Sequence, residues 1–202
     1  MKKENKKSNL ETLACFMMEL RNLKHIPRAG IVFLKGPTKE NVAEHCFYTT
    51  IIGWILAKLE KANENKIIKM CLSHDIVEVR IGDENLINKF YSYPVNEPRV
   101  LREILTDSGF NHSDIENLFE EFFEGKTNDA KIAKDADILS QMIWEKECLD
   151  LGNKKAEKWV DFSLSRLKTR NGKALGKRIK DLDCDEWWVD LVKKYLLKTK
   201  FL

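Results

Sequence analysis

Glycine and proline, the residues that most often interrupt regular structure, are scarce in this chain: its 202 residues include nine glycines and four prolines. Few turns are therefore available, and the composition argues against a disordered or fibrous chain. Basic residues exceed acidic residues by only three, with the two signs interspersed, so the chain lacks the basic stripe of a non-specific nucleic-acid binder. We expect no nucleic-acid polymer as a partner.

Long apolar runs are also missing, because nowhere do about eighteen apolar residues occur together. The N-terminal stretch from Met1 to Asn9 is too charged for a signal peptide. The five cysteines are an odd number without a close pairing pattern and lie in apolar helical stretches, which indicates reduced thiols. We therefore expect a soluble, cytoplasmic protein that does not bind a membrane.

What the chain does have is helical periodicity. Apolar residues make up 43% and charged residues 33% of the sequence, and apolar positions recur at helical spacing. The pattern predicts an all-α bundle of about ten helices and no convincing strand. The first helix, over about 10–24, is expected to supply ordinary core, and the second, over about 38–60, is apolar on nearly every face and hence central. Further helices are predicted over 65–79, 100–108, 113–125, 128–151 and 154–170, with two more after Gly172.

The stretch from Cys71 to Asp83 combines reactive groups with a buried helical pattern. It contains an imidazole, three carboxylates and a guanidinium within thirteen residues. His74 and Glu78 are four residues apart, so on one helix they share a stripe that also carries apolar residues. Burial without partners would cost roughly 2–7 kcal/mol for each polar group and more for a charge. A metal ion is the simplest compensation.

Candidate ligands come from three predicted helices: His45, His74, Asp75 and Asp137. Two imidazoles and two carboxylates suit one divalent ion among Mn, Co, Fe, Zn and Mg, with positions left for water and substrate. Taken alone, a histidine such as His45 is more often a hydrogen-bonded core residue. With one core expected for this length, we predict a single domain over residues 1–202. Its central metal-site core covers about 27–150, and the C-terminal helices over 153–202 pack on it.

Four other residues stay open at this stage. Arg28 lies in a loop broken by proline and glycine, where it either presents its guanidinium to a phosphate or is a solvated surface residue. Asp135 is about 160° from Asp137 around their helix and is expected in solvent. Cys46 and Cys71 are close in sequence to the histidines, which leaves a cysteine-based zinc site as a rival to their interpretation as small buried hydrophobes.

The order of these residues resembles the HD-domain metal-dependent phosphohydrolases, whose pattern is His, then His-Asp, then Asp. The resemblance is closer to the 5'-deoxynucleotidases and their HD-domain-containing relatives, which remove phosphate from deoxyribonucleoside monophosphates. It covers residues 27 to 137, and the last sixty residues carry no signature. The matching segments are Pro27-Arg28-Ala29-Gly30, Glu40-Asn41-Val42-Ala43-Glu44-His45, His74-Asp75-Ile76-Val77-Glu78 with Gly82-Asp83, and Lys134-Asp135-Ala136-Asp137.

The resemblance implies a role for each candidate. Arg28 would contact the phosphate, and Glu78 and Asp83 would handle protons and position the attacking water. The substrate would be a nucleoside monophosphate and the protein a homodimer. The implied ligands of the single divalent ion are His45, His74, Asp75 and Asp137.

The sequence also departs from that branch. Ile31 and Lys39 stand where a tryptophan and a proline are common, and Glu84-Asn85-Leu86 replaces the usual residues after Gly82-Asp83. Loss of the aromatic puts the distinction between deoxyribose and ribose in question. The alternatives are an HD phosphohydrolase acting on another nucleotide phosphoester and a non-catalytic nucleotide-sensing domain. The prediction is a phosphomonoesterase that uses a metal-activated water.

Overall fold

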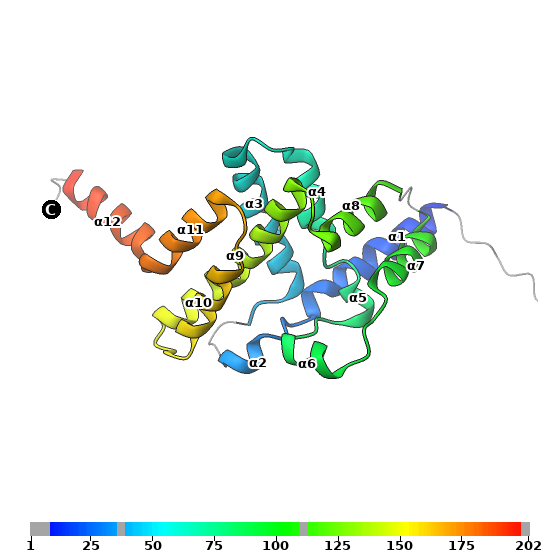
Figure 1. Ribbon diagram of the computed structural model, residues 1–202, viewed down its shortest axis with the longest axis horizontal. Coiled ribbons are helices and arrows are strands. Elements are labelled where there is room, and N and C mark those ends of the chain that lie inside the picture. Colours follow the sequence, from blue (N-terminus) through cyan, green and yellow to red (C-terminus); the bar gives the residue numbers. More distant parts are fainter. Residues whose placement is uncertain (1–8, 36–38, 110–112, 199–202) are drawn as a thin grey trace, which may run out of the picture.

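The computed structural model describes residues 9–35, 39–109 and 113–198, which form an assembly of helices (Figure 1). Twelve α-helices and one 3-10 helix lie in these ranges, where the only extended pairing is an isolated bridge between Pro27 and Asn41. The predicted all-α class is therefore confirmed.

The helix starts are marked by capping residues. Asparagine or threonine side chains accept a hydrogen bond from an otherwise unpaired main-chain N–H at Asn41, Asn63, Asn85, Asn96, Thr127 and Thr169. Thr38, predicted to open the second helix, lies outside the described residues. The elements are α1 (Asn9–Leu20), η1 (Arg21–His25), α2 (Ile31–Leu34), α3 (Val42–Glu60), α4 (Glu64–Ser73), α5 (Glu78–Ile81), α6 (Leu86–Tyr91), α7 (Glu97–Ser108), α8 (Ser113–Glu124), α9 (Asn128–Asp150), α10 (Ala156–Arg166), α11 (Arg170–Asp181) and α12 (Glu186–Lys198).

The central helix is α9, which crosses the middle of the molecule in Figure 1 and packs against α3, α4, α8, α10 and α11. Its Ala136 joins Leu56 of α3 and Met70 of α4 in one apolar core. Helices α3 and α4 approach so closely that a Cβ atom on Gly53 would stand 2.6 Å from the Cys71 sulfur. This packing fixes the relative positions of the three helices from which the candidate ligands come.

The helix predicted over 65–79 is interrupted, so the prediction that His74 and Glu78 share one α-helical stripe is wrong. Helix α4 ends at Ser73, a turn occupies residues 74–77, and α5 begins at Glu78. The His74 ring nitrogen Nδ1 lies 2.7 Å from the Cys71 carbonyl oxygen, and main-chain bonds spanning three residues continue the turn. The imidazole thus bonds to the Cys71 carbonyl oxygen, which in a continuing α-helix would accept a main-chain N–H from the next turn.

Two helices are less buried than their patterns predict. Helix α1 has no fully buried residue, so it covers the core from outside, where its half-buried Phe16 and Leu20 pack against two apolar clusters. Helix α3 is buried where it meets α4 and α9, but it is not enclosed. Because α3 is apolar all round, its pattern could not show which side faces outward. We call its exposed side the outer face of α3, formed by Phe47, Tyr48, Ile51, Trp54, Ile55 and Leu59.

Asp135, expected in solvent, is fully buried. Its carboxylate accepts hydrogen bonds from the main-chain N–H of Lys168 at 2.8 Å, and from the N–H and hydroxyl of Thr169, each at 2.7 Å. Thr169 is the N-cap of α11. The side of α9 that carries Asp135 therefore anchors the start of α11 instead of facing water.

The C-terminal helices differ in how they sit on this core. Helices α10 and α11 pack on α9, whereas α12 extends away from the body at one end of the molecule (Figure 1). No helix in the described ranges is long and apolar enough to cross a membrane.

Candidate metal centre

The four predicted ligands converge on one point. The Nε2 atom of His45 lies 3.0 Å from Asp137 Oδ1 and 3.7 Å from Asp75 Oδ2, and His74 Nε2 lies 3.1 Å from the same Asp75 oxygen and 4.0 Å from that of Asp137. Ligand atoms about 2.0–2.2 Å from one ion lie roughly 3–4 Å from each other. The spacing fits a single ion held between α3, the end of α4 and α9.

The His74 ring is oriented for a metal by the main chain. Its Nδ1 donates to the Cys71 carbonyl at 2.7 Å, which turns Nε2 toward the cluster. This buried Nε2 atom lies 3.1 Å from Asp75 Oδ2, and although burial lowers the pKa of His74, Asp75 and Asp137 outweigh it and raise that pKa to about 9, so a metal ion would take the place of a proton there. On the other histidine, Nδ1 of His45 lies 3.2 Å from the Ser140 hydroxyl while Nε2 faces the carboxylates. Both rings therefore present Nε2 toward the cluster.

The two carboxylates are ionised and ready to bind a cation. Burial alone would raise the pKa of Asp137, but the hydrogen bond and charge of His45 bring it down to about 2. For Asp75, burial is likewise outweighed, here by His74 and Arg28, and its pKa lies well below the ordinary range. Two carboxylates and two imidazoles balance the charge of a divalent ion, so the residues present fit the metal that the sequence predicts.

The rival cysteine site is only partly supported by the geometry. Cys46 lies close enough to His74 and Asp75 for one donor atom of each to fall within 4.8 Å of the others. Burial, with the charge of Asp75 next, raises the pKa of this thiol far above its usual range. Because the thiolate is the form that binds metals, Cys46 is a poor ligand here. Cys71 is buried against the α3 helix and joins no such group among the described residues.

Arg28 lies beside the cluster and is not a solvated surface residue. Its main-chain N–H donates to the Glu40 carbonyl at 3.0 Å, and its guanidinium Nη1 lies 3.4 Å from both Asp75 and Asp83. Asp83 also accepts the main-chain N–H of Ala29 at 2.8 Å. The structure therefore brings Asp83 to the loop that carries Arg28, and Asp83 anchors that loop.

Glu78 points a carboxyl group into the same space. Its side chain is 9% exposed, and its Oε2 atom has no hydrogen-bond partner. Burial, followed by the charges of Asp75 and Asp83, raises the pKa of Glu78 to about 10 in the absence of metal. A carboxyl group that is neutral near pH 7 can donate a proton.

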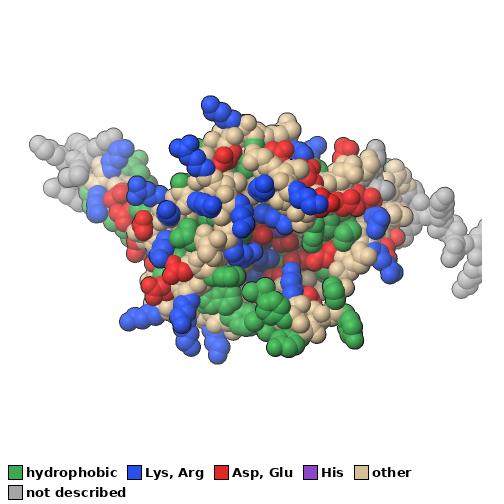
Figure 2. Space-filling model, viewed as in Figure 1, with side chains coloured by type: hydrophobic (Ala, Val, Ile, Leu, Met, Phe, Trp, Pro, Cys, Tyr) green, Lys and Arg blue, Asp and Glu red, His purple; other side chains and the backbone are tan. Residues whose placement is uncertain are grey.

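Two cavities meet over these residues. The first, of about 290 Å³, reaches from Arg28 and Asp83 to α10, and the second, of about 370 Å³, lies between α8 and the segment around α6. Asp75, Glu78 and Asp137 line both, whereas His45 lies behind them and lines neither. Figure 2 shows acidic side chains in a recess at the centre of this face, with basic side chains above and hydrophobic ones below.

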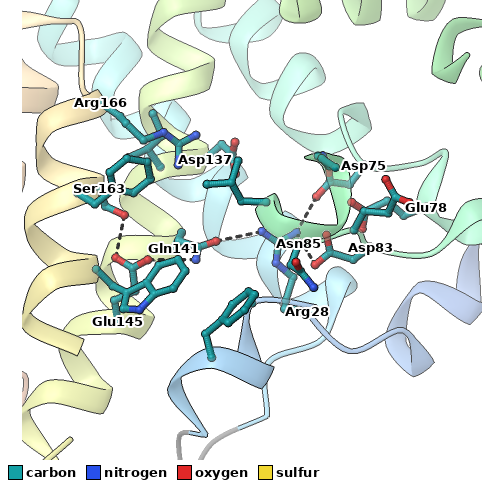
Figure 3. Close-up of a pocket in the computed structure, with 18 residues that line it drawn as sticks. Arg28, Asp75, Glu78, Asp83, Asn85, Asp137, Gln141, Glu145, Ser163 and Arg166 are labelled. Atoms are coloured by element: carbon teal, nitrogen blue, oxygen red, sulfur yellow. Dashed lines mark hydrogen bonds and ion pairs between the residues drawn. The ribbon is translucent and has the colours of Figure 1, made fainter. Parts of the chain in front are cut away.

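A chain of hydrogen bonds that the sequence did not predict leads from Arg28 to α10 (Figure 3). Arg28 Nη2 donates to Gln141 Oε1 at 3.3 Å, Gln141 Nε2 donates to Glu145 at 3.1 Å, and Ser163 donates to the other Glu145 oxygen at 2.8 Å. Gln141 follows Asp137 by one helical turn, and this spacing could have identified it from the sequence as a residue of the site. The α10 residues carry no such sequence signal, because their approach to the site depends on how α10 packs.

Comparison with known proteins agrees with this geometry. A family model described as an HD domain matches residues 20–182. The chain therefore belongs to the HD-domain family, and the predicted resemblance and enzyme class, an HD-domain phosphohydrolase, are confirmed. Among its relatives, the 5'-deoxynucleotidase HDDC2 of Dictyostelium discoideum is 32% identical over 146 residues, covering 65% of this chain and 77% of the relative. The protein of the same name from Danio rerio is 26% identical, covering 72% and 74%.

Solved structures share the fold. A conserved hypothetical protein from Pyrococcus furiosus aligns with a TM-score of 0.67 at 24% identity, covering 84% of this chain and 99% of its own. A protein from Magnetospirillum magnetotacticum, described as a predicted metal-dependent phosphohydrolase, aligns with a TM-score of 0.65 at 22% identity, covering 87% and 95%. These similarities confirm the helical bundle.

Proposed function

We propose that the protein is a metal-dependent phosphomonoesterase that removes the 5'-phosphate from ribo- or deoxyribonucleoside monophosphates. The observation that carries the proposal is the buried Nε2 atom of His74, 3.1 Å from Asp75 and 4.0 Å from Asp137, with the unpartnered Oε2 atom of Glu78 lining the same cavity. The relatives named 5'-deoxynucleotidase support the choice of substrate. His45, His74, Asp75 and Asp137 would hold one divalent ion.

When bound, that ion would neutralise phosphoryl charge and lower the pKa of a water molecule. The remaining work falls to side chains of the protein. Arg28 would contact a phosphoryl oxygen, because its contacts to Asp75, Asp83 and Gln141, at 3.3–3.4 Å, are long enough to be exchanged for a charge-assisted bond to phosphate. The loop that carries Arg28 is held by Asp83, which positions the guanidinium before the substrate arrives.

Glu78 would protonate the departing sugar 5'-oxygen. A leaving alkoxide needs a proton, and burial with the nearby carboxylates raises the pKa of Glu78 to about 10 in the metal-free protein, which favours a carboxyl group that carries a proton. Its unpartnered Oε2 atom is available to face the substrate. Asp83 would share proton handling and orientation of the attacking water, as the resemblance implies.

The proposal includes a homodimer in the cytoplasm. Side chains on the outer face of α3 and along α12 leave apolar area in water that a second copy would cover. The five cysteines, all in the described ranges, form no disulfide, in keeping with a reducing compartment.

The test is a panel of nucleoside mono-, di- and triphosphates with Mn, Co, Zn and Mg, scored by release of inorganic phosphate. We expect phosphate from one or more 5'-monophosphates and loss of turnover in Glu78→Gln, with metal content unchanged. Loss of metal from that variant would make Glu78 a ligand. A metal-loaded protein that is inert toward the whole panel would exclude the enzymatic function and favour the nucleotide-sensing alternative.

A further inference from the structure

The first cavity has two chemically different ends. One end holds the ion pairs of Arg28 with Asp75 and Asp83, and the other end is formed by α2 and α10. In Figure 3, Glu145, Ser163 and Arg166 lie on the opposite side of Gln141 from Arg28. The proposed metal centre and phosphate site account for the first end alone, so the end at α10 has no assigned ligand.

Aromatic rings line this unassigned end. Phe33 of α2 and Trp159 of α10 stack with ring centroids 5.5 Å apart and planes inclined by 22°, and both rings are half-buried. The helices that carry the two rings are held together, because Leu34 of α2 packs with Trp144 of α9 and Ala156 of α10 in a separate apolar cluster. The two rings cover one of each other's faces and both line the first cavity, so this aromatic wall offers a nucleobase a remaining ring face on which to stack.

The polar groups at this end disfavour a phosphate. Glu145 is 1% exposed, and both of its oxygens accept hydrogen bonds, from Gln141 and Ser163. Burial raises the pKa of Glu145, but in these two bonds its oxygens act as acceptors and offer a phosphate no donor. Arg166, the nearby cation, lies over the Phe162 ring at 5.6 Å at the exposed rim. The Arg28 guanidinium lies beside the candidate metal ligands, so we expect the charged part of a substrate there and its neutral part toward α10.

We propose that the end of the first cavity formed by α2 and α10 is the nucleoside site, where the base stacks on the wall made by Phe33 and Trp159. This inference rests on the proposed function and names the part of the substrate that α10 recognises. The whole cavity, with its phosphate end included, has a volume of about 290 Å³, near the lower end for small-ligand pockets, which suits one small ligand of the size of a nucleotide.

The experiment compares ligands with and without a base. Turnover is measured on deoxynucleoside 5'-monophosphates and on 2-deoxyribose 5-phosphate, and calorimetry measures binding of deoxynucleosides and of orthophosphate to the metal-loaded protein. The variants are Trp159→Leu, Trp159→Phe and, as a control, Tyr93→Leu, a change of an exposed aromatic residue that does not line the first cavity. Loss of base stacking predicts about a tenfold fall in kcat/KM for nucleotides and in nucleoside affinity for Trp159→Leu. Trp159→Phe restores most of both.

The base-free ligands make the outcome decisive. We expect 2-deoxyribose 5-phosphate and orthophosphate to behave alike in wild type and Trp159→Leu, which shows that the variant is folded and its metal centre intact. Equal losses on both substrate classes, or unchanged nucleoside binding in Trp159→Leu, overturn the inference and leave the proposed function standing. If the wild type binds nucleosides through Trp159 but hydrolyses no ester, the proposed function falls and the nucleoside site stands.

Discussion

The main chain fixes His74 before any metal arrives. Its Nδ1–H is taken by the Cys71 carbonyl, so ring flipping or a tautomer change would break a buried hydrogen bond. The fold therefore orients this candidate ligand in advance, and the contact lies directly after the end of α4 at Ser73. The interruption of the helix is thus also the feature that directs the His74 imidazole toward the candidate metal site.

Metal content should depend on the histidine and aspartate set and not on the thiols. His74→Ala and Asp137→Asn each remove a donor from the cluster, and we expect metal affinity to fall at least about 100-fold, because even indirect contacts of a metal site are worth 10–100-fold. Elemental analysis after dialysis against a weak chelator measures the bound metal. Cys46→Ala and Cys71→Ala are the matched controls and should retain it. Retention by Asp137→Asn together with loss from Cys46→Ala would establish the cysteine site instead, because that site combines Cys46 with His74 and Asp75.

The sequence predicted the residues whose signal is local. His45, His74, Asp75 and Asp137 carry a recognisable order along the chain, and the structure places their donor atoms within 4.0 Å of a neighbouring ligand. Glu145 could not be predicted. The pattern of an amphipathic helix predicts that a glutamate faces solvent. The burial of Glu145 against Ser163 instead results from the packing of α10 on α9.

At the scale of elements, α9 links the metal centre to the C-terminal helices. Asp137 faces the ligands, Gln141 and Glu145 continue toward α10, and Asp135 holds the start of α11. The sequence pattern identified α9 and its length but assigned Asp135 to solvent, because periodicity shows that two residues face opposite sides without showing what covers each side. Asp137 and Asp135, two residues apart, therefore have different roles: Asp137 lies in the candidate metal site, and Asp135 stabilises the fold.

Asp135→Ala should destabilise the protein without removing the metal ligands. The change leaves the N–H groups of Lys168 and Thr169 and the Thr169 hydroxyl without their acceptor in a fully buried place, so we expect a loss of about 3 kcal/mol in the free energy of unfolding. Urea denaturation of the metal-free protein measures it. Asp161→Ala, which removes a half-exposed ion pair with Lys180, is the control and should change stability by less than about 1 kcal/mol. Equal effects of the two changes would show that the contacts of Asp135 do not anchor α11.

At the scale of the whole molecule, apolar area is distributed unevenly. One core is shared by α3, α4 and α9, yet the outer face of α3 and most of α12 remain in water, with Trp187 at 73% exposed. An isolated helix of thirteen residues is marginal in water, so α12 needs tertiary or quaternary contacts to persist. The proposed homodimer would supply them.

Light scattering coupled to size-exclusion chromatography tests the dimer directly. The wild type should show a mass of twice 23.6 kDa. Ile51→Glu with Ile55→Glu on the outer face of α3, or Trp187→Lys with Leu191→Lys on α12, should shift it toward the monomer, because each pair places charges where apolar contact is expected. Tyr93→Glu, a change of a still more exposed aromatic residue (96%) that lies in neither helix, should leave the mass unchanged. A monomeric wild type would contradict the homodimer, and dissociation by only one of the two pairs would identify which helix forms the contact.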